Sequence, residues 1–197
     1  MRALLPALAL LEFDSIAFGI AAGDAMVKRA PVKTIFAGTV HPGRYLVLVA
    51  GDVASVEESL EAGLSLSPPK DRIYLPGAHP ELARILSGGR NDRLGEALGV
   101  VETRSSASIL GVADRGLKGA DVRLQELRLA DGLGGKAFCT FTGLLSDVDA
   151  AVELGVEGLE DPENLVARVV IPQIHEEMLT NLGRGVDFAS RLVGSGG

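Results

Sequence analysis

The chain has 197 residues, 47% of them hydrophobic and 4% aromatic, with a net charge of −7 and an isoelectric point near 5.0. The acidic balance argues against nucleic-acid binding, which needs clustered lysine and arginine. No apolar run reaches the roughly 18 to 20 residues of a membrane helix, so the high apolar content predicts burial between the subunits of an oligomer.

The first predicted element is a strand at 8–13, because this apolar run is too short for a helix. A helix then runs to Lys28 from a cap at Asp14 or Ser15, and its many alanines and glycines permit close packing. This N-terminal stretch imitates a secretory signal. The same pattern returns at 97–122, where no signal peptide can lie, so we expect folded structure.

Two strands, a helix and a further strand complete the first pattern. Strands are expected at 32–40 and 44–49 around a short turn, followed by a helix at 53–62 with Asp52 as its cap and a strand at 72–75. The order β-α-β-β-α-β is that of the ferredoxin-like split motif, an α+β fold.

The second half of the chain repeats the first after a polar, glycine-rich link at 86–95. Residues 7–32 recur at 97–122 with an offset of 90, and later matches continue at offsets of 92 and 96, so short insertions separate the copies. Such a long period indicates two tandem domains, 1–90 and 91–197. In the second copy, strands are expected at 98–103, 122–130, 136–142 and 168–171. One helix is expected from a cap at Ser105 to Lys118, and another from a cap at Ser146 to Leu154. A terminal helix at 176–193 is expected before a disordered GSGG end.

Both copies carry the same short signatures. DAMVKRAPV at 24–32 matches ADRGLKGADV at 113–122, a strand ending in AGD matches one ending in TGL, and LPGAH matches IPQIH. These residues resemble the shell-protein domain of bacterial microcompartments, the BMC domain, over about 7–82 and 97–179. Two such domains in one chain resemble the tandem-domain shell proteins that form trimers (BMC-T), in their unpermuted order.

The resemblance implies a homotrimer whose six domains surround one axis as a pseudohexameric tile with a central pore for metabolites. In that family the hairpin loops line the pore, and the matching positions here are Val40, His41, Pro42, Gly43, Asp131, Gly132, Leu133, Gly134 and Gly135. Threefold symmetry would turn Asp131 into an acidic ring and His41 into a titratable one, and such rings select solutes by charge and hydrogen bonding. Taken without the family, such loops are usually plain turns.

The resemblance also places a tile-edge lysine at Lys28 and Lys118, although helix-end lysines are ordinarily solvated charges favoured by the helix dipole. The edge arginine of the family is replaced by Gly77 and Gln173, so edge contacts are expected to be weaker or asymmetric. The implied partners are further copies of the chain, hexameric and pentameric shell proteins and encapsulated enzymes, in a shell within the cytoplasm, with no nucleic acid and no membrane.

No residue pattern predicts an enzyme, because no nucleophile has a base partner and the histidines lack metal-ligand spacing, so no catalytic residue, metal or cofactor is expected. Two alternatives stay open. One is a trimeric regulatory protein of ferredoxin-like fold that binds a ligand between subunits. The other is an electron-transfer shell protein with a metal cluster at the pore, as in relatives that supply a cysteine from each subunit. The single cysteine, Cys139, lies on a strand beyond the loop, which disfavours the cluster, and it excludes an intrachain disulfide.

Overall fold

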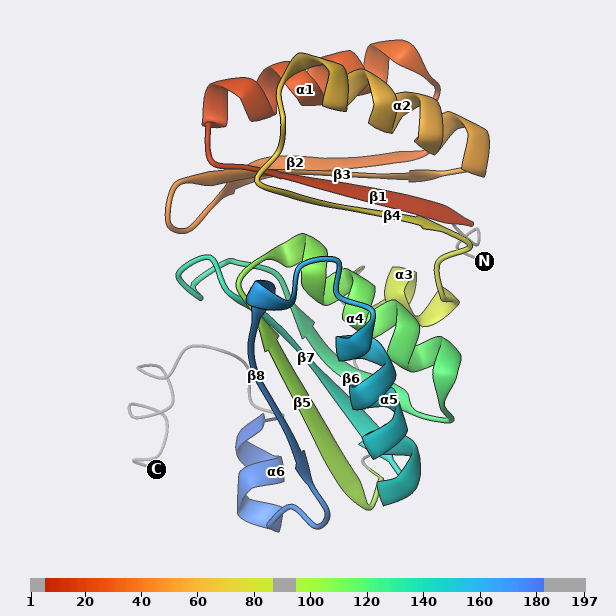
Figure 1. The fold of residues 1–197 in the computed structure, drawn as a ribbon, viewed down its shortest axis with the longest axis vertical. Coiled ribbons are helices and arrows are strands. Elements are labelled where there is room, and N and C mark those ends of the chain that lie inside the picture. Colours follow the sequence, from red (N-terminus) through yellow and green to blue (C-terminus); the bar gives the residue numbers. More distant parts are fainter. Residues whose placement is uncertain (1–5, 87–94, 183–197) are drawn as a thin grey trace, which may run out of the picture.

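A computed structural model describes residues 6–86 and 95–182 as two domains of the same architecture (Figure 1). The first domain contains β1 (Ala7–Phe13), α1 (Ile16–Arg29), β2 (Thr34–Val40), β3 (Arg44–Gly51), α2 (Val53–Leu66), β4 (Asp71–Pro76) and α3 (Pro80–Leu86). The second contains β5 (Ala97–Thr103), α4 (Ser106–Gly119), β6 (Arg123–Arg128), β7 (Ala137–Gly143), α5 (Leu145–Glu157), a 3₁₀ turn (Pro162–Asn164), β8 (Leu165–Ile171) and α6 (Glu176–Leu182).

Each domain has one four-stranded antiparallel sheet, with the strand orders β2-β3-β1-β4 and β6-β7-β5-β8. Ala7 pairs with Gly51 in the first sheet and Ala97 with Gly143 in the second, so the sequence duplication is kept residue by residue. Helices α1 and α2 cover one face of the first sheet, and α4 and α5 cover one face of the second (Figure 1). The predicted α+β fold, two ferredoxin-like domains in tandem, is confirmed.

Three helices begin at capping residues that the sequence predicted. Ser15, Asp52 and Ser105 each accept a hydrogen bond from the backbone N–H three residues further on, at 3.3, 3.0 and 3.1 Å. These bonds satisfy N–H groups that the helix itself leaves without partners, which is why short polar side chains before an apolar run mark helix starts.

Several other predicted boundaries are wrong. Helix α2 ends at Leu66 instead of residue 62, and β8 begins at Leu165 instead of residue 168. The cap of α5 is Leu144, not Ser146, because the N–H of Val148 already bonds to the carbonyl oxygen of Leu144 at 2.9 Å and the first turn begins earlier. Strand β6 ends at Arg128 instead of residue 130, because Ala130 has a φ of 39° and leaves the extended conformation.

A short helix follows the last strand of each domain, and the sequence did not predict the first of them. Each follows a histidine, His79 or His175, whose Nδ1 accepts the backbone N–H two residues later at 3.3 Å. Helix α3 reaches Leu86, where the link between the copies was expected to begin. The rest of that link, the predicted helix beyond residue 182 and the GSGG end lie outside the described residues.

The second domain covers the face of the first sheet that α1 and α2 leave open (Figure 1). Along β1, Ala9 and Leu11 pack beneath α1 and α2, whereas Leu8 and Leu10 belong to a core that extends into the second domain. Helix α4 packs against β4 and β1, and α3 packs against β6. The central strands β1 and β3 of the first sheet are therefore buried on both faces, although the edge strand β2 stays largely exposed. In the second sheet, Val169 on β8 is half exposed. None of the helices in the described ranges combines the length and apolar character needed to cross a bilayer.

Candidate functional site: hairpin loops and domain junction

The two hairpin loops that the sequence assigns to a pore lie on the same flank of the molecule and touch each other (Figure 1). A Cβ atom on Gly135 would lie 2.8 Å from Nη1 of Arg44 and 2.9 Å from Cδ of Pro42. Only glycine fits this approach, and its φ of +83° also favours glycine. Nη1 of Arg44 donates a hydrogen bond to the carbonyl oxygen of Gly135 at 3.1 Å, which fastens one loop to the other.

Most of the predicted loop positions are accessible on this flank. The exposed ones are His41, Pro42, Gly43, Asp131, Gly132 and Gly134, the half-buried ones are Val40 and Leu133, and the buried one is Gly135. The longer loop is ordered by its own backbone, because the N–H of Leu133 bonds to Ala130 at 3.0 Å and the N–H of Lys136 bonds to Leu133 at 3.2 Å. Arg128 also donates to the carbonyl oxygen of Asp131 at 3.1 Å.

Cys139 lies apart from the loops, in the core of the second domain. It pairs with Val101 across β7 and β5 and is fully buried, and burial raises the pKa of its thiol. A thiol held in its neutral form is a poor metal ligand. Within residues 6–86 and 95–182, no group of three or more His, Cys, Asp or Glu side chains is arranged to hold a metal ion.

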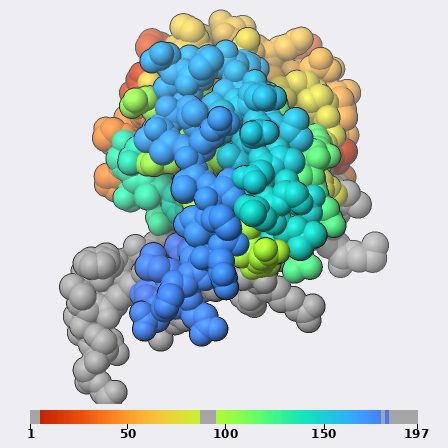
Figure 2. Space-filling model, turned by 60° about the horizontal axis from the view of Figure 1, so that its bottom comes forward, coloured from red at the N-terminus to blue at the C-terminus, as the bar shows by residue number. Residues whose placement is uncertain are grey.

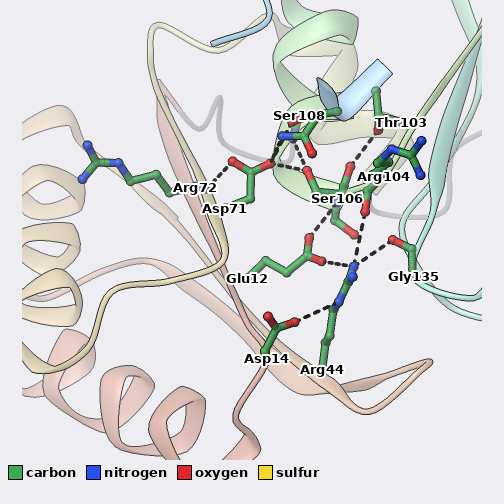
Figure 3. Close-up of polar contacts among 12 residues, drawn as sticks. Glu12, Asp14, Arg44, Asp71, Arg72, Thr103, Arg104, Ser106, Ser108 and Gly135 are labelled. Carbon is green, nitrogen blue, oxygen red and sulfur yellow. Dashed lines mark hydrogen bonds and ion pairs between the residues drawn. The ribbon is translucent and has the colours of Figure 1, made fainter. Parts of the chain in front are cut away.

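A buried polar cluster joins the two domains next to the loops (Figure 3). Glu12 on β1 is fully buried; its carboxylate accepts from Arg44 at 2.7 Å and from the backbone N–H of Ser106, the first residue of α4, at 2.8 Å. Arg44 also pairs with Asp14 at 3.2 Å and donates to the carbonyl oxygen of Arg104 at 3.3 Å. Burial raises the pKa of Glu12, and the Ser106 amide and the Arg44 guanidinium oppose part of that rise.

Asp71 on β4 forms the second half of this cluster (Figure 3). Its Oδ2 accepts hydrogen bonds from the hydroxyls of Ser105 and Ser108, the latter at 2.7 Å, and from Nδ2 of Asn164 at 3.4 Å. A carboxylate at this position also favours the helix because it faces the positive end of the α4 dipole. Glu12 and Asp71 together hold the start of α4 on the first sheet.

We did not predict this cluster from the sequence, although one sign of it was present. An acidic residue inside an apolar run, Glu12, recurs as Glu102, and the basic residue Arg44 recurs as Lys136. Lys136 forms an ion pair with Glu102 in the structure, so the second domain carries its own copy of the Arg44–Glu12 pair. A carboxylate repeated within a predicted buried strand, together with a repeated cation, indicates a structural ion pair.

The structure brings one predicted edge lysine beside one predicted edge turn. Lys118 at the end of α4 pairs with Asp114 at 2.5 Å. Oδ1 of the same carboxylate accepts the backbone N–H of His79 at 2.8 Å, two residues beyond Gly77. Lys118 of the second domain and the Gly77 turn of the first therefore meet through Asp114.

The other two predicted edge residues lie far apart within one chain. Lys28 at the end of α1 pairs with Asp24 at 2.6 Å, on the exposed side of that helix. Gln173 is exposed between β8 and α6, at the opposite end of the molecule from α1 (Figure 1).

Comparison with known proteins agrees with these two copies. The BMC domain matches residues 7–73 and 97–174. The bacterial microcompartment shell protein PduT of Citrobacter freundii is 37% identical over 181 residues, which cover 91% of this chain and 98% of PduT. The crystal structure of a microcompartment protein from Desulfitobacterium hafniense DCB aligns with a TM-score of 0.77 and 40% sequence identity, covering 87% of this chain and 97% of that one. The carboxysome assembly protein CcmO of Synechocystis sp. is 27% identical over 191 residues, which cover 87% of this chain and 63% of CcmO.

The chain therefore belongs to the BMC domain family, with two BMC domains in tandem. Its similarity to PduT extends over nearly the whole length of both proteins. The chain is a structural shell protein of the tandem-domain type, BMC-T. The family resemblance carried by DAMVKRAPV and its repeat is confirmed.

Proposed function

We propose that three chains close head to tail into a pseudohexagonal tile of a microcompartment shell, with the hairpin loops around a central pore. One observation within the chain carries this proposal. The faces that are buried where the two domains meet have counterparts in the other domain that are exposed. A single chain therefore leaves one helix face and one sheet face uncovered, and a second copy of the chain supplies the cover for each.

The helix face is the outer side of α1. Leu110 and Leu117 on α4 are buried in the core that spans both domains. The same helix positions in α1 are occupied by Ile20, which is 54% exposed, and Val27, which is 41% exposed. Large apolar side chains exposed side by side usually mark an interaction surface. Since α4 packs on β1 and β4, we expect α1 to pack on the equivalent strands β5 and β8 of another chain.

The sheet face is formed by β8 and α6, which run across one surface of the molecule (Figure 2). Ile73 on β4 is buried, whereas its counterpart on β8, Val169, is 50% exposed. Leu82 on α3 is buried, whereas its counterpart on α6, Met178, is 53% exposed. Both differences have the same explanation if α1 and β2 of a neighbouring chain cover this face.

These two faces make the contact heterologous, since a helix face of one chain meets a sheet face of the next. Repeated heterologous contacts produce a closed ring when the rotation closes, and three chains supply the six domains of a pseudohexamer. In that ring Glu102, paired with Lys136, would accept the backbone N–H of Ile16 from the next chain, as Glu12 accepts that of Ser106 within a chain.

The ring would place both kinds of hairpin loop around its axis. We assign residues 40–43 and 131–135 to the pore lining, supported by the contact between the two loops at Gly135. Three copies of Asp131 would form an acidic ring that disfavours anions, and three copies of His41 would add a ring of imidazole groups that can form hydrogen bonds with solutes.

At the rim of the tile we assign Lys28, Lys118, Gly77 and Gln173 to contacts with neighbouring tiles, which include hexameric and pentameric shell proteins. The same proposal includes the division into domains 1–90 and 91–197 and a location in a shell within the cytoplasm. It also includes contacts with encapsulated enzymes and the lack of a catalytic role.

Solution mass and negative-stain imaging of the full chain, with and without a single-domain shell protein, test the proposal. Three chains of 20.5 kDa each, a particle of about 60 kDa that forms six-sided discs and joins sheets, would support it. A monomer would contradict it. A trimer that never tiles, and whose melting temperature shifts with a metabolite, would favour a ligand-binding regulator. Iron and colour in the purified protein would favour a pore metal cluster, against which the burial of Cys139 weighs.

A further inference from the structure

We infer that the contact between chains differs in chemistry from the contact within a chain, and that the difference selects a second copy of this chain as the partner. It rests on the trimer proposed above and names one pairing in it: Phe18 of one chain packs against Ala167 of the next. Within the chain, the equivalent contact joins Ser108 to Asp71.

Strand register identifies the equivalent positions in the two sheets. Asp71 lies opposite Glu12 in the pairing of β4 with β1, and Ala167 lies opposite Glu102 in the pairing of β8 with β5. Because Glu12 and Glu102 are themselves counterparts, aspartate and alanine occupy the same site. Ala167 is exposed, so the second sheet presents a methyl group where the first presents a carboxylate.

The helix that packs on each sheet has changed in the complementary way. Ser108 is the third residue of α4, and its hydroxyl donates to Asp71 at 2.7 Å. Phe18 is the third residue of α1 and is 55% exposed. A hydroxyl facing a carboxylate is therefore matched by a phenyl ring facing a methyl group, and both sides of the contact differ together.

Helix α4 suits only the first sheet, with Asp71, and α1 suits only the second sheet of another chain, with Ala167. Phe18 placed against Asp71 would bury the carboxylate without one of the two hydroxyls that solvate it, which is unfavourable. Ser108 placed against Ala167 would bury a hydroxyl without an acceptor. Specificity of this kind depends on penalties against the wrong pairing as well as on contacts in the right one. The pair directs α1 of a second copy to β5 and β8 and away from β1 and β4.

A double-mutant cycle tests the pairing, with trimer dissociation of the full chain measured by analytical ultracentrifugation over a dilution series. Ala167→Asp places a carboxylate against Phe18 and should weaken assembly at least ~100-fold. Phe18→Ser removes the apolar contact and should weaken it by ~10-fold or more. In the double variant a hydroxyl faces a carboxylate, as Ser108 faces Asp71, so assembly should recover at least ~10-fold relative to Ala167→Asp alone.

Matched variants on the outer face of α2 control for changes in polarity. Leu66→Ser removes an apolar side chain of similar exposure and Ala54→Asp adds a carboxylate at an exposed alanine, and neither should change assembly. Melting curves by circular dichroism check the fold of every variant. Should Ala167→Asp not fold, Ala167→Asn with Phe18→Ser tests the same contact without a charge.

Losses that simply add in the double variant would overturn the pairing and leave the trimer standing. A wild-type chain that forms no trimer at any concentration would overturn the proposed tile and the pairing together.

Discussion

Arg44 connects both the two domains and the two hairpin loops. Its guanidinium contacts the buried carboxylate of Glu12 in the first sheet and the carbonyl oxygen of Gly135 in the second loop. A buried ion pair adds little net stability compared with an apolar pair, but removal of one partner leaves an uncompensated charge. Arg44 therefore acts as a positioning residue for the loops. Its removal should lower stability because the buried carboxylate of Glu12 would lose its cation.

Arg44→Ala should lower the free energy of unfolding by about 3 kcal/mol, because Glu12 would keep the Ser106 amide but lose its cation. Arg29→Ala is the matched control: Arg29 is 61% exposed and pairs with Glu58 at 3.5 Å, so its loss should cost less than about 1 kcal/mol. Urea unfolding at one fixed protein concentration measures both. Equal losses in the two variants would contradict the role given to Arg44.

The pH dependence of stability should reveal Glu12. Its pKa in the folded chain is raised above the ordinary value of 4.5, mainly by burial, so the folded chain holds this proton more tightly than the unfolded chain. The stability that this gives is fully present below pH 4.5 and is lost as the pH rises through the raised pKa. Glu12→Gln keeps the shape but removes the titration, so its unfolding free energy should fall less between pH 4 and pH 7, roughly the range that brackets this titration. Parallel pH profiles of the two proteins in urea unfolding would rule this explanation out.

The helices of each domain pack closely because glycines lie at their contacts. A Cβ atom on Gly116 of α4 would lie 2.5 Å from Cζ of Phe141 and 3.0 Å from the carbonyl oxygen of Ala151 on α5. Neither neighbour has room to give way in a packed core. By contrast, a Cβ atom on Gly23 of α1 would meet the Val47 methyl groups at 3.5 and 3.6 Å, which is ordinary contact.

Gly116→Ala should destabilise the protein by about 2 kcal/mol, because overpacking outweighs the gain of about 1 kcal/mol in helix propensity. Gly23→Ala should stabilise it by about 0.5 to 1 kcal/mol, since the propensity gain meets no clash. Ala113 already occupies the position of α4 that Gly23 has in α1. Thermal and urea unfolding of both variants give the sign of each change. A stabilised Gly116→Ala would mean that α4 and α5 shift apart more easily than their contacts indicate.

A single chain places the equivalent helices of its two domains in different environments. Its two long first helices have the same sequence pattern, but α4 is covered by the first domain whereas the outer face of α1 is exposed. On α4 these apolar residues stabilise the fold of one chain, whereas on α1 they are exposed, and in the proposed tile a second copy covers them.

Two aspartate substitutions at equivalent positions separate these roles. Leu110→Asp puts a charge in the core and should prevent folding of the single chain. Ile20→Asp changes an exposed position, so the chain should fold with a near-normal circular dichroism spectrum but remain monomeric. Size-exclusion chromatography with light scattering, together with circular dichroism, distinguishes the two results. A trimeric Ile20→Asp variant would argue that α1 lies outside the contact between chains.

Features that depend on near neighbours in the sequence were predictable. Ser15, Asp52 and Ser105 cap helices because each bonds to an N–H three residues away, and the strands show their apolar runs directly. The start of α5 at Leu145 was missed because its first turn has no side-chain cap. Helix α3 was missed because its stability depends on packing against the second domain, which no local pattern reveals.

The sequence by itself determined that two copies of one ferredoxin-like domain follow each other and where their hairpin loops lie, because duplication and apolar periodicity are written along the chain. Only the tertiary structure decided which domain has its sheet covered by the other domain. The contact of Glu12 with Ser106 and that of Asp71 with Ser108 join residues distant in the sequence, and they form only when α4 packs on the first sheet. The physical reason is that local propensity fixes a helix or a strand, whereas burial of a face depends on the surface that meets it.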